Sequence, residues 1–153
     1  MKDKILLVDA DFYKDIADEL VRGAINELEK KNLSYDRISV PGALEIPATI
    51  AIVSQKTMTN PYIGYVALGC VIRGETSHYD IVCSESARGL MKLSIDKGLA
   101  IGNGILTVDN AAQAWARASL NKKNKGKFLI FPLSCLMFRL FYMSRNSLKK
   151  TLQ

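Results

Sequence analysis

The chain has 153 residues, the size of one domain, and its 48% hydrophobic and 24% charged residues are typical of a globular protein with a packed core. The net charge of +6 does not indicate a nucleic-acid-binding domain, because eight of the 21 basic residues and none of the acidic ones lie from Asn121 onward. The rest of the chain holds 13 basic and 15 acidic residues and shows no aromatic-interleaved RNA-binding pattern, so we expect no nucleic-acid partner.

Cysteine and histidine content excludes several kinds of site. The cysteines are odd in number and form no C-x-x-C pair, and a single histidine cannot build a metal centre, so we expect neither a disulfide framework nor a metal site. The N-terminal segment MKDKILLVDAD has neither the apolar region nor the cleavage site of a signal peptide. These features fit a protein of the reducing cytoplasm.

Strand-like and helix-like segments alternate along the chain. Short apolar or alternating runs predict strands at residues 5–8, 34–40, 62–72 and 99–108. Helical spacing of apolar residues predicts helices at residues 12–31, 43–53, 80–97 and 110–118. We expect Asp11 and Asn110 to be N-caps of the first and last helices, and Gly98 to end the third.

This alternation predicts an α/β fold in which a parallel sheet carries helices on both faces. Ligands of such sheets bind at the carboxyl ends of the strands. Three conspicuous segments fall at those ends, namely DADFYK after the first strand, PGALEIP after the second and RGETSHYD after the third. We therefore expect one site built from all three.

The segment RGETSHYD has the composition of an anion-binding loop. Gly74 lets backbone amides approach an anion, Thr76 and Ser77 supply hydroxyl donors, and the following helix contributes its positive N-terminal end. Imidazole groups in general titrate near neutral pH, so His78 could accept and return protons. The alternatives are an ordinary helix cap beside a surface loop and a solvent-exposed histidine.

Four further residues each have a functional and a purely structural interpretation. Glu45 is placed to hold a polar ligand, but a carboxylate in the first turn of a helix is favourable in any case. Arg117 and Lys125 could neutralise a phosphate or lie on a solvated basic surface. Phe12 could stack on a planar heterocycle or pack in the core.

Taken together, PGALEIP, GCVIRGETSHYD, IGNGILTVDNAAQAWARA and NKG occur in an order and at separations that resemble the 6,7-dimethyl-8-ribityllumazine synthase family. The resemblance covers residues 4 to about 127. It implies a flavodoxin-like four-stranded parallel sheet and the condensation of 5-amino-6-(D-ribitylamino)uracil with 3,4-dihydroxy-2-butanone 4-phosphate, a step of riboflavin biosynthesis that needs no cofactor or metal. It also implies pentamers, decamers or sixty-subunit shells with active sites between neighbouring subunits.

The same resemblance assigns roles to individual residues. His78 matches the proton-transfer residue. The pyrimidine substrate is expected to contact Phe12, Ala43, Leu44, Glu45, Cys70, Val71, Ile72 and Asn103. The butanone phosphate is expected to contact Glu75, Thr76, Arg117 and Lys125. The family often has Phe at the position of Leu44 and an aromatic residue at that of Asn103, so the contact that covers the substrate ring is altered here.

Beyond Lys127 the resemblance stops. The family continues with an alanine-rich amphipathic helix, whereas residues 128–143 of this chain are almost wholly apolar and contain Pro132. This run is too short for a comfortable membrane span, so we expect it to dock on the domain or lie buried in an oligomer. We therefore predict a domain at residues 1–127 and a divergent tail at 128–153.

The divergent tail leaves alternative functions open. One is a catalytically impaired oligomer that keeps the fold and binds flavin-like ligands or forms a shell. Another is a flavodoxin-like response or carrier domain, which the lack of a phosphoacceptor pattern disfavours. Formation of the fluorescent lumazine would separate an active transferase from both.

Overall fold

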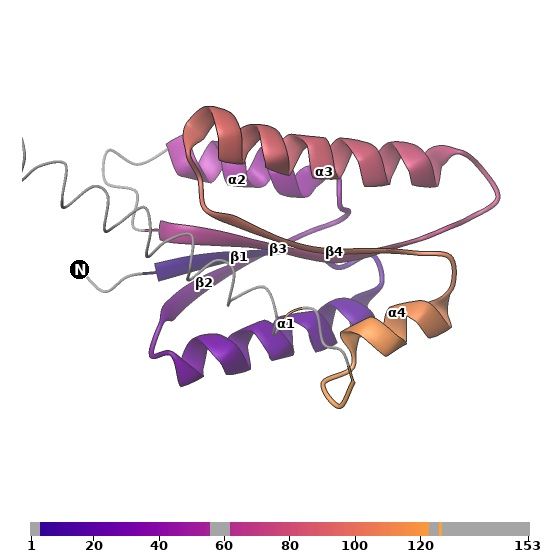
Figure 1. Ribbon diagram of the computed structural model, residues 1–153, viewed down its shortest axis with the longest axis horizontal. Coiled ribbons are helices and arrows are strands. Elements are labelled where there is room, and N and C mark those ends of the chain that lie inside the picture. The colour runs from indigo at the N-terminus through magenta and orange to yellow at the C-terminus, as the bar shows by residue number, and fades with distance from the viewer. Residues whose placement is uncertain (1–3, 56–61, 123–125, 127–153) are drawn as a thin grey trace, which may run out of the picture.

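The computed structural model describes residues 4–55, 62–122 and 126, which form one α/β layer structure (Figure 1). Strands and helices alternate in the order β1 (Lys4–Ala10), α1 (Lys14–Lys30), β2 (Ser34–Val40), α2 (Glu45–Gln55), β3 (Tyr62–Ile72), α3 (His78–Lys97), β4 (Ile101–Val108) and α4 (Ala111–Ala118). The predicted alternation is confirmed, and the predicted bounds of β2 and β3 agree with the structure.

All four strands are parallel, in the order β2-β1-β3-β4. The chain first moves from β1 outward to β2 and then crosses back over β1 to β3. The strand order therefore reverses between β1 and β3, and a crevice outside the carboxyl ends of these two strands is where a parallel sheet of this kind binds ligands.

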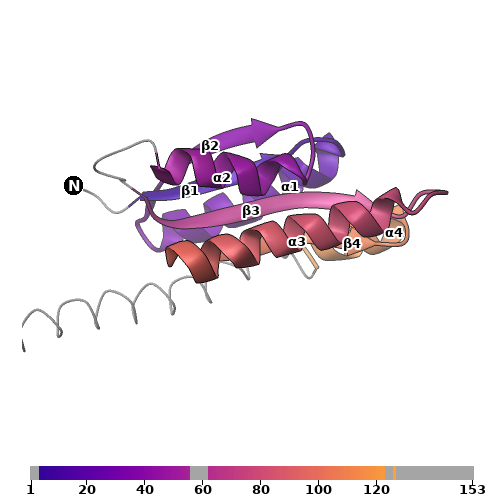
Figure 2. The ribbon, with the colours of Figure 1, turned by 90° about the horizontal axis from the view of Figure 1, so that it is seen from above.

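The helices cover the two faces in pairs. α1 and α4 lie on one face of the sheet, and α2 and α3 lie on the other (Figures 1 and 2). Side chains of β1 alternate between the two sides, so that Ile5 and Leu7 join the core beneath α1 while Leu6 and Val8 join the core beneath α2 and α3. The predicted four-stranded sheet with helices on both faces is confirmed.

Two predicted helix starts are corrected by the structure. Asp11 is not the N-cap of α1: its backbone N–H donates to Val40 O at 3.0 Å and continues the hydrogen bonds between β1 and β2. The helix begins three residues later, after Tyr13. α3 begins at His78 rather than Asp80.

Two predicted helix ends are confirmed. The Asn110 side chain accepts a hydrogen bond from the Gln113 N–H at 2.9 Å and caps α4. Gly98 ends α3 in the left-handed conformation, with φ of 63°, which a residue without a Cβ adopts at little cost.

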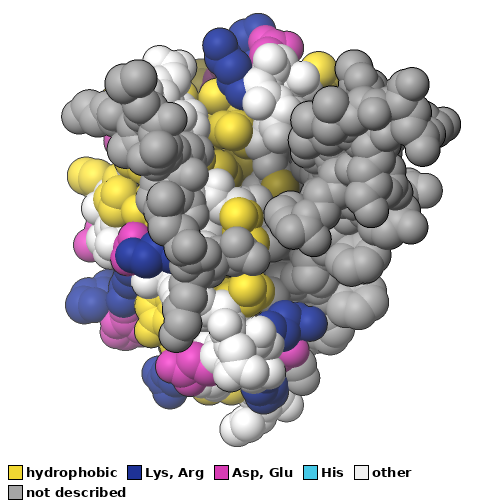
Figure 3. All heavy atoms as spheres, turned by 90° about the vertical axis from the view of Figure 1, so that its left-hand side faces the viewer, with side chains coloured by type: hydrophobic (Ala, Val, Ile, Leu, Met, Phe, Trp, Pro, Cys, Tyr) yellow, Lys and Arg dark blue, Asp and Glu magenta, His cyan; other side chains and the backbone are white. Residues whose placement is uncertain are grey.

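The end of the molecule at which the strands begin carries basic and acidic side chains interspersed with apolar ones (Figure 3). Among the described residues, no helix is both long and apolar enough to cross a membrane. The predicted tail at 128–153, with Pro132, and the predicted ligand Lys125 lie outside the described residues.

Candidate active site

A pocket of about 310 Å³ lies where β1, β2 and β3 end and α2 and α3 begin. This is the edge of the sheet at which its topology predicts a ligand site. The pocket is lined by Phe12, Tyr13, Gly42, Ala43, Leu44, Glu45, Cys70, Val71, Ile72, Gly74, Thr76, His78, Tyr79 and Val82. The three segments singled out in the sequence therefore meet around one cavity.

Apolar side chains form the accessible walls of this pocket. Phe12 is 73% exposed and makes an edge-to-face contact with Tyr13, with ring centroids 5.0 Å apart. Leu44 is also exposed, and both it and Phe12 line the cavity. An aromatic ring that stays exposed beside a cavity offers a face on which a planar heterocycle can stack.

Glu45 supplies a carboxylate in the first turn of α2. Its backbone N–H donates to Gly42 O at 3.3 Å, so the chain turns tightly just before the helix. The Glu45 Oε2 atom would lie 2.9 Å from a Cβ placed on Gly42, so a larger residue at position 42 would displace the carboxylate. Glycine at this position therefore lets the carboxylate fold back over the turn, within the pocket.

Cys70, Val71 and Ile72 are the last three residues of β3, and all of them line the pocket. Cys70 is almost fully buried, and this burial raises the pKa of its thiol to about 11. The thiol is therefore protonated at neutral pH and is a poor nucleophile. Cys70 contributes shape and apolar surface rather than a reactive thiolate.

The loop from Arg73 to Ser77 joins β3 to α3. The Thr76 hydroxyl accepts a hydrogen bond from the His78 backbone N–H at 3.3 Å, and both residues line the pocket. A Cβ on Gly74 would meet no atom within 4 Å, so the backbone there is open to an approaching group. The loop therefore places an accessible backbone, a hydroxyl and an imidazole together at the positive end of a helix.

Comparison with known proteins identifies the family of this chain. The profile described as 6,7-dimethyl-8-ribityllumazine synthase matches residues 2–130. A 6,7-dimethyl-8-ribityllumazine synthase of Bartonella bacilliformis is 56% identical over 133 residues, which cover 87% of each chain. One of Agrobacterium fabrum is 54% identical over 129 residues, 83% of this chain and 87% of its own. The chain belongs to the 6,7-dimethyl-8-ribityllumazine synthase family.

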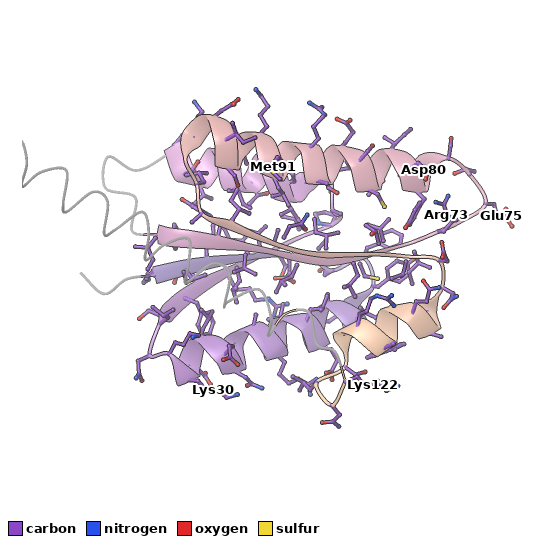
Figure 4. All side chains as sticks on the ribbon, viewed as in Figure 1. Lys30, Arg73, Glu75, Asp80, Met91 and Lys122 are labelled. Carbon is purple, nitrogen blue, oxygen red and sulfur yellow. The ribbon has the colours of Figure 1, made fainter. Side chains whose placement is uncertain are left out.

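In this member of the lumazine synthase family, nine of the site residues predicted from the sequence line the pocket of a single chain. They are Phe12, Ala43, Leu44, Glu45, Cys70, Val71, Ile72, Thr76 and His78. Glu75 is exposed at the tip of the loop between β3 and α3 and does not line the cavity (Figure 4). Its side chain is therefore not part of the pocket of a single chain.

Asn103 lies far from the pocket of its own chain. It pairs in register with Ala67, five residues before Ile72, which places it roughly 16 Å from that end of the sheet at the usual rise per residue. Its side-chain oxygen accepts a hydrogen bond from Ile105 N–H at 3.1 Å. β4 is an edge strand, so Asn103 lies where another copy of the chain can reach it.

Arg117 is also separated from the pocket. It lies in the last turn of α4, on the face of the sheet opposite α2 and α3 (Figure 1). One of its terminal nitrogens, Nη1, donates to Gln113 O at 3.0 Å. A lumazine synthase site that uses Arg117 must therefore take it from a different copy.

Tyr13, Tyr79 and Val82 line the pocket but were not predicted from the sequence. Tyr79 and Val82 follow His78 at intervals of one and four residues, so the first turns of α3 present them on the pocket side. A predicted start of α3 at His78 would have placed Tyr79 in the first turn of the helix. Among the described residues there is no group of three or more His, Cys, Asp or Glu side chains that could hold a metal ion.

Proposed function

We propose that this transferase condenses 5-amino-6-(D-ribitylamino)uracil with 3,4-dihydroxy-2-butanone 4-phosphate, giving 6,7-dimethyl-8-ribityllumazine, phosphate and water. The observation that carries the proposal is the position of His78, the only histidine of the chain, between an apolar pocket and a loop suited to an anion. The membership of the chain in the lumazine synthase family supports it.

The pocket has a part suited to each substrate. Phe12 stacks on the pyrimidine ring. Ala43, Leu44 and Glu45 contact the pyrimidine and its ribityl chain. The end of β3, from Cys70 to Ile72, contacts the edge of the ring. Thr76, the backbone at Gly74 and the N-terminus of α3 hold the phosphate of the second substrate. The amine and the ketone are thereby held side by side, and this supplies most of the rate gain.

His78 transfers the protons that the reaction requires. Formation of the imine from amine and ketone needs a proton delivered to the departing hydroxyl. Elimination of phosphate needs a proton removed beside the carbonyl-derived carbon. One imidazole at the junction of the two substrates can serve both steps, and no cofactor or metal is required.

A neighbouring copy completes the site. Asn103 and Arg117 lie away from the pocket of their own chain, so in this proposal each serves the pocket of an adjacent copy, Arg117 by neutralising the departing phosphate. Lys125 is proposed as a second cation near that phosphate. Glu75 is assigned to the same phosphate-binding loop.

Exposed apolar side chains support this association. They lie on α2 and α3 and are Ile52, Ile81, Met91 and Ile95. Apolar surface left exposed on one side of a protein is typical of subunit interfaces. We propose a homo-oligomer built from pentamers, which acts in the cytoplasm on small-molecule substrates, with a catalytic domain at 1–127 and a separate tail at 128–153.

Purified protein incubated with both substrates tests the function directly, with the fluorescence of the lumazine as the signal. We expect turnover in the wild-type chain and slower turnover in His78→Ala and Arg117→Ala, both of which should retain the wild-type circular dichroism spectrum. Rates unchanged in both variants would refute the assigned roles. Size-exclusion chromatography of the same samples reports whether the chain self-associates.

A further inference from the structure

Arg73, the first residue after β3, holds together the segments that surround the loop. Its Nη1 and Nη2 atoms donate to Asp80 Oδ2 and Oδ1 at 3.3 and 3.0 Å, and its Nε lies 3.5 Å from Asp109 Oδ1. Its backbone N–H donates to Val108 O at 2.9 Å. Figure 4 shows Arg73 beside Asp80 where the chain turns from β3 into α3. One guanidinium therefore joins the end of β3, the first turn of α3 and the end of β4.

The same guanidinium covers an aromatic wall of the pocket. Its central carbon lies 4.1 Å from the centroid of the Tyr79 ring, a cation–π distance. Tyr79 lines the pocket and follows His78 directly in α3. Arg73 thus contacts the face of a ring that borders the pocket next to His78.

Arg73 itself is not among the residues that line the pocket. Two of its five N–H donors bond to the Asp80 carboxylate, and its Nε is close enough to Asp109 for an ion pair. Its position outside the pocket therefore disfavours a role as a direct phosphate ligand.

We propose that Arg73 is a positioning residue for the condensation: it fixes the loop at 74–77 and the first turn of α3, and so sets where the phosphate binds relative to the His78 imidazole. This inference rests on the function proposed above. Its physical basis is the fork geometry of arginine, which can pair with a carboxylate through two nitrogens while its plane stacks on a ring. A lysine keeps the charge but provides neither the fork nor the stacking plane.

The contacts of Arg73 continue toward Arg117 on the other side of the sheet. The backbone N–H of Asp109 donates to Gln113 Oε1 at 3.0 Å, and Gln113 O accepts from Arg117 at 3.0 Å. The loop of one pocket is therefore joined through Asp109 to the helix whose arginine serves the adjacent pocket. Asp109→Asn should weaken this connection while leaving the pair between Arg73 and Asp80 in place.

The test compares Arg73→Ala and Arg73→Lys with the wild-type chain and with Arg22→Ala, an exposed arginine on α1 that pairs with Glu19. Arg73→Ala should lower kcat by about 10- to 100-fold, because small displacements of reacting groups have effects of this size. The KM for the butanone phosphate should rise. The KM for the pyrimidine should change by less than about twofold, because the variant leaves the contacts that bind this substrate in place. Arg73→Lys should recover part of kcat, and Arg22→Ala should match the wild type.

A second measurement does not depend on turnover. Titration with inorganic phosphate, followed through the backbone amide resonances of Gly74 and Thr76, should give a several-fold weaker Kd in Arg73→Ala than in the wild type. If the wild-type chain forms no lumazine, the proposed function fails, and the titration still tests the positioning role. Wild-type phosphate binding in Arg73→Ala, or wild-type kcat in an active enzyme, would overturn the inference. If Arg73→Ala does not fold, the same readouts in Arg73→Lys decide.

Discussion

The two faces of the sheet differ in how completely one chain covers them. α1 buries seven of its 17 residues, whereas α3 buries only Ser86 and Leu90 of its 20. The helices of the second face, α2 and α3, begin at the pocket and carry the exposed apolar side chains Ile52, Ile81, Met91 and Ile95. We call the side of α1 and α4 the closed face and the side of α2 and α3 the open face. The closed face therefore holds more of the buried helix residues, whereas the open face borders the pocket and leaves apolar side chains exposed.

The largest expected effect tests whether the open face is completed by a second copy. His78→Ala and Arg117→Ala should each lower kcat by about 100- to 1,000-fold, the range for losing a proton-transfer group or a fixed charge at a developing anion. When the two variants are unfolded together and reassembled in equal amounts, about one quarter of the sites should combine an intact His78 with an intact Arg117, because each comes from a different copy. Lumazine fluorescence measures the recovery.

The control for this mixture is each variant reassembled alone, which should stay at its own low rate. No recovery from a mixture that has reassembled to the wild-type size would mean that His78 and Arg117 act within one copy or not at all. That outcome would contradict the division between a closed face and an open face that needs a neighbour.

The next effect separates stability from assembly. Leu28 on the closed face is fully buried, so Leu28→Ala should lower the free energy of unfolding by about 2–5 kcal/mol through lost contacts and a cavity. Met91 on the open face is 61% exposed, so Met91→Ala should change the stability of a single chain by less than about 0.5 kcal/mol. Urea unfolding at a fixed protein concentration measures both.

Assembly should respond in the opposite order. Met91→Asp places a charge on the exposed surface of α3, so it should shift the protein toward smaller species in sedimentation velocity. A Leu28→Ala chain that still folds should sediment like the wild type. If Met91→Asp leaves the sedimentation coefficient unchanged, α3 does not take part in the assembly.

The closed face was also the easier one to predict from the sequence. The apolar residues that recur at helical spacing are Ile16, Leu20, Val21, Ala24, Ile25 and Leu28, and the structure buries all of them in α1 except Ile25, which is half-buried. Such periodicity predicts a helix directly, because one face of the helix meets the core. The start of α1 was wrong, since the hydrogen bond from Asp11 N–H to Val40 O is a tertiary contact that local sequence does not encode.

The open face was harder to predict for the same physical reason. Only two residues of α3 are buried, so the spacing of its apolar residues does not indicate which side of the helix faces the core. The predicted start of α3 was two residues too late, at Asp80 instead of His78. The resemblance to the lumazine synthase family predicted nine residues that line the pocket, and they meet there because parallel strands bring their carboxyl ends together. Tyr79 was missed together with the start of α3. The positions of Asn103 and Arg117 depend on the strand register and on the face that α4 covers, which the motifs do not give.

A smaller effect tests a buried charge on the closed face. The Asp9 side chain is fully buried and accepts hydrogen bonds from Arg37 Nε and Nη2, both at 2.8 Å, and from the Ser39 hydroxyl at 3.1 Å. The Asp9 carboxylate raises the pKa of Arg37, so the arginine stays charged. Arg37→Ala should cost about 2 kcal/mol, less than for a fully buried pair because Arg37 is partly exposed and Ser39 remains.

The matched control for Arg37→Ala is Arg22→Ala, because Arg22 is 57% exposed and its partner Glu19 keeps a hydrogen bond from the Leu120 N–H. This variant should change the free energy of unfolding by less than about 0.5 kcal/mol. Chemical denaturation of the two variants at one protein concentration measures the difference. Equal effects would show that burial of Asp9 adds nothing to the stability of the closed face.

The smallest effect belongs to a polar cluster on the open face. The Tyr62 hydroxyl and the Lys4 ammonium contact Asp36 at 2.8 and 3.0 Å, and they lower the pKa of its carboxyl group, with the Tyr62 hydrogen bond as the larger cause. A lowered pKa in the folded state means that the contribution to stability is present above the unfolded pKa of about 4 and is lost as the pH falls through the folded value. Because the Asp36 side chain is 41% exposed, Asp36→Asn should cost less than about 0.5 kcal/mol at pH 7.

This difference between the wild type and Asp36→Asn should shrink toward zero as the pH is lowered from about 5 to about 2, since the native carboxyl then becomes neutral as well. It should also shrink at high salt, because exposed charges are screened. Urea midpoints of both proteins across that pH range, at one protein concentration, measure it. A difference that persists at low pH and in high salt would arise from packing around Tyr62 rather than from charge, and this part of the open face would then resemble the closed one.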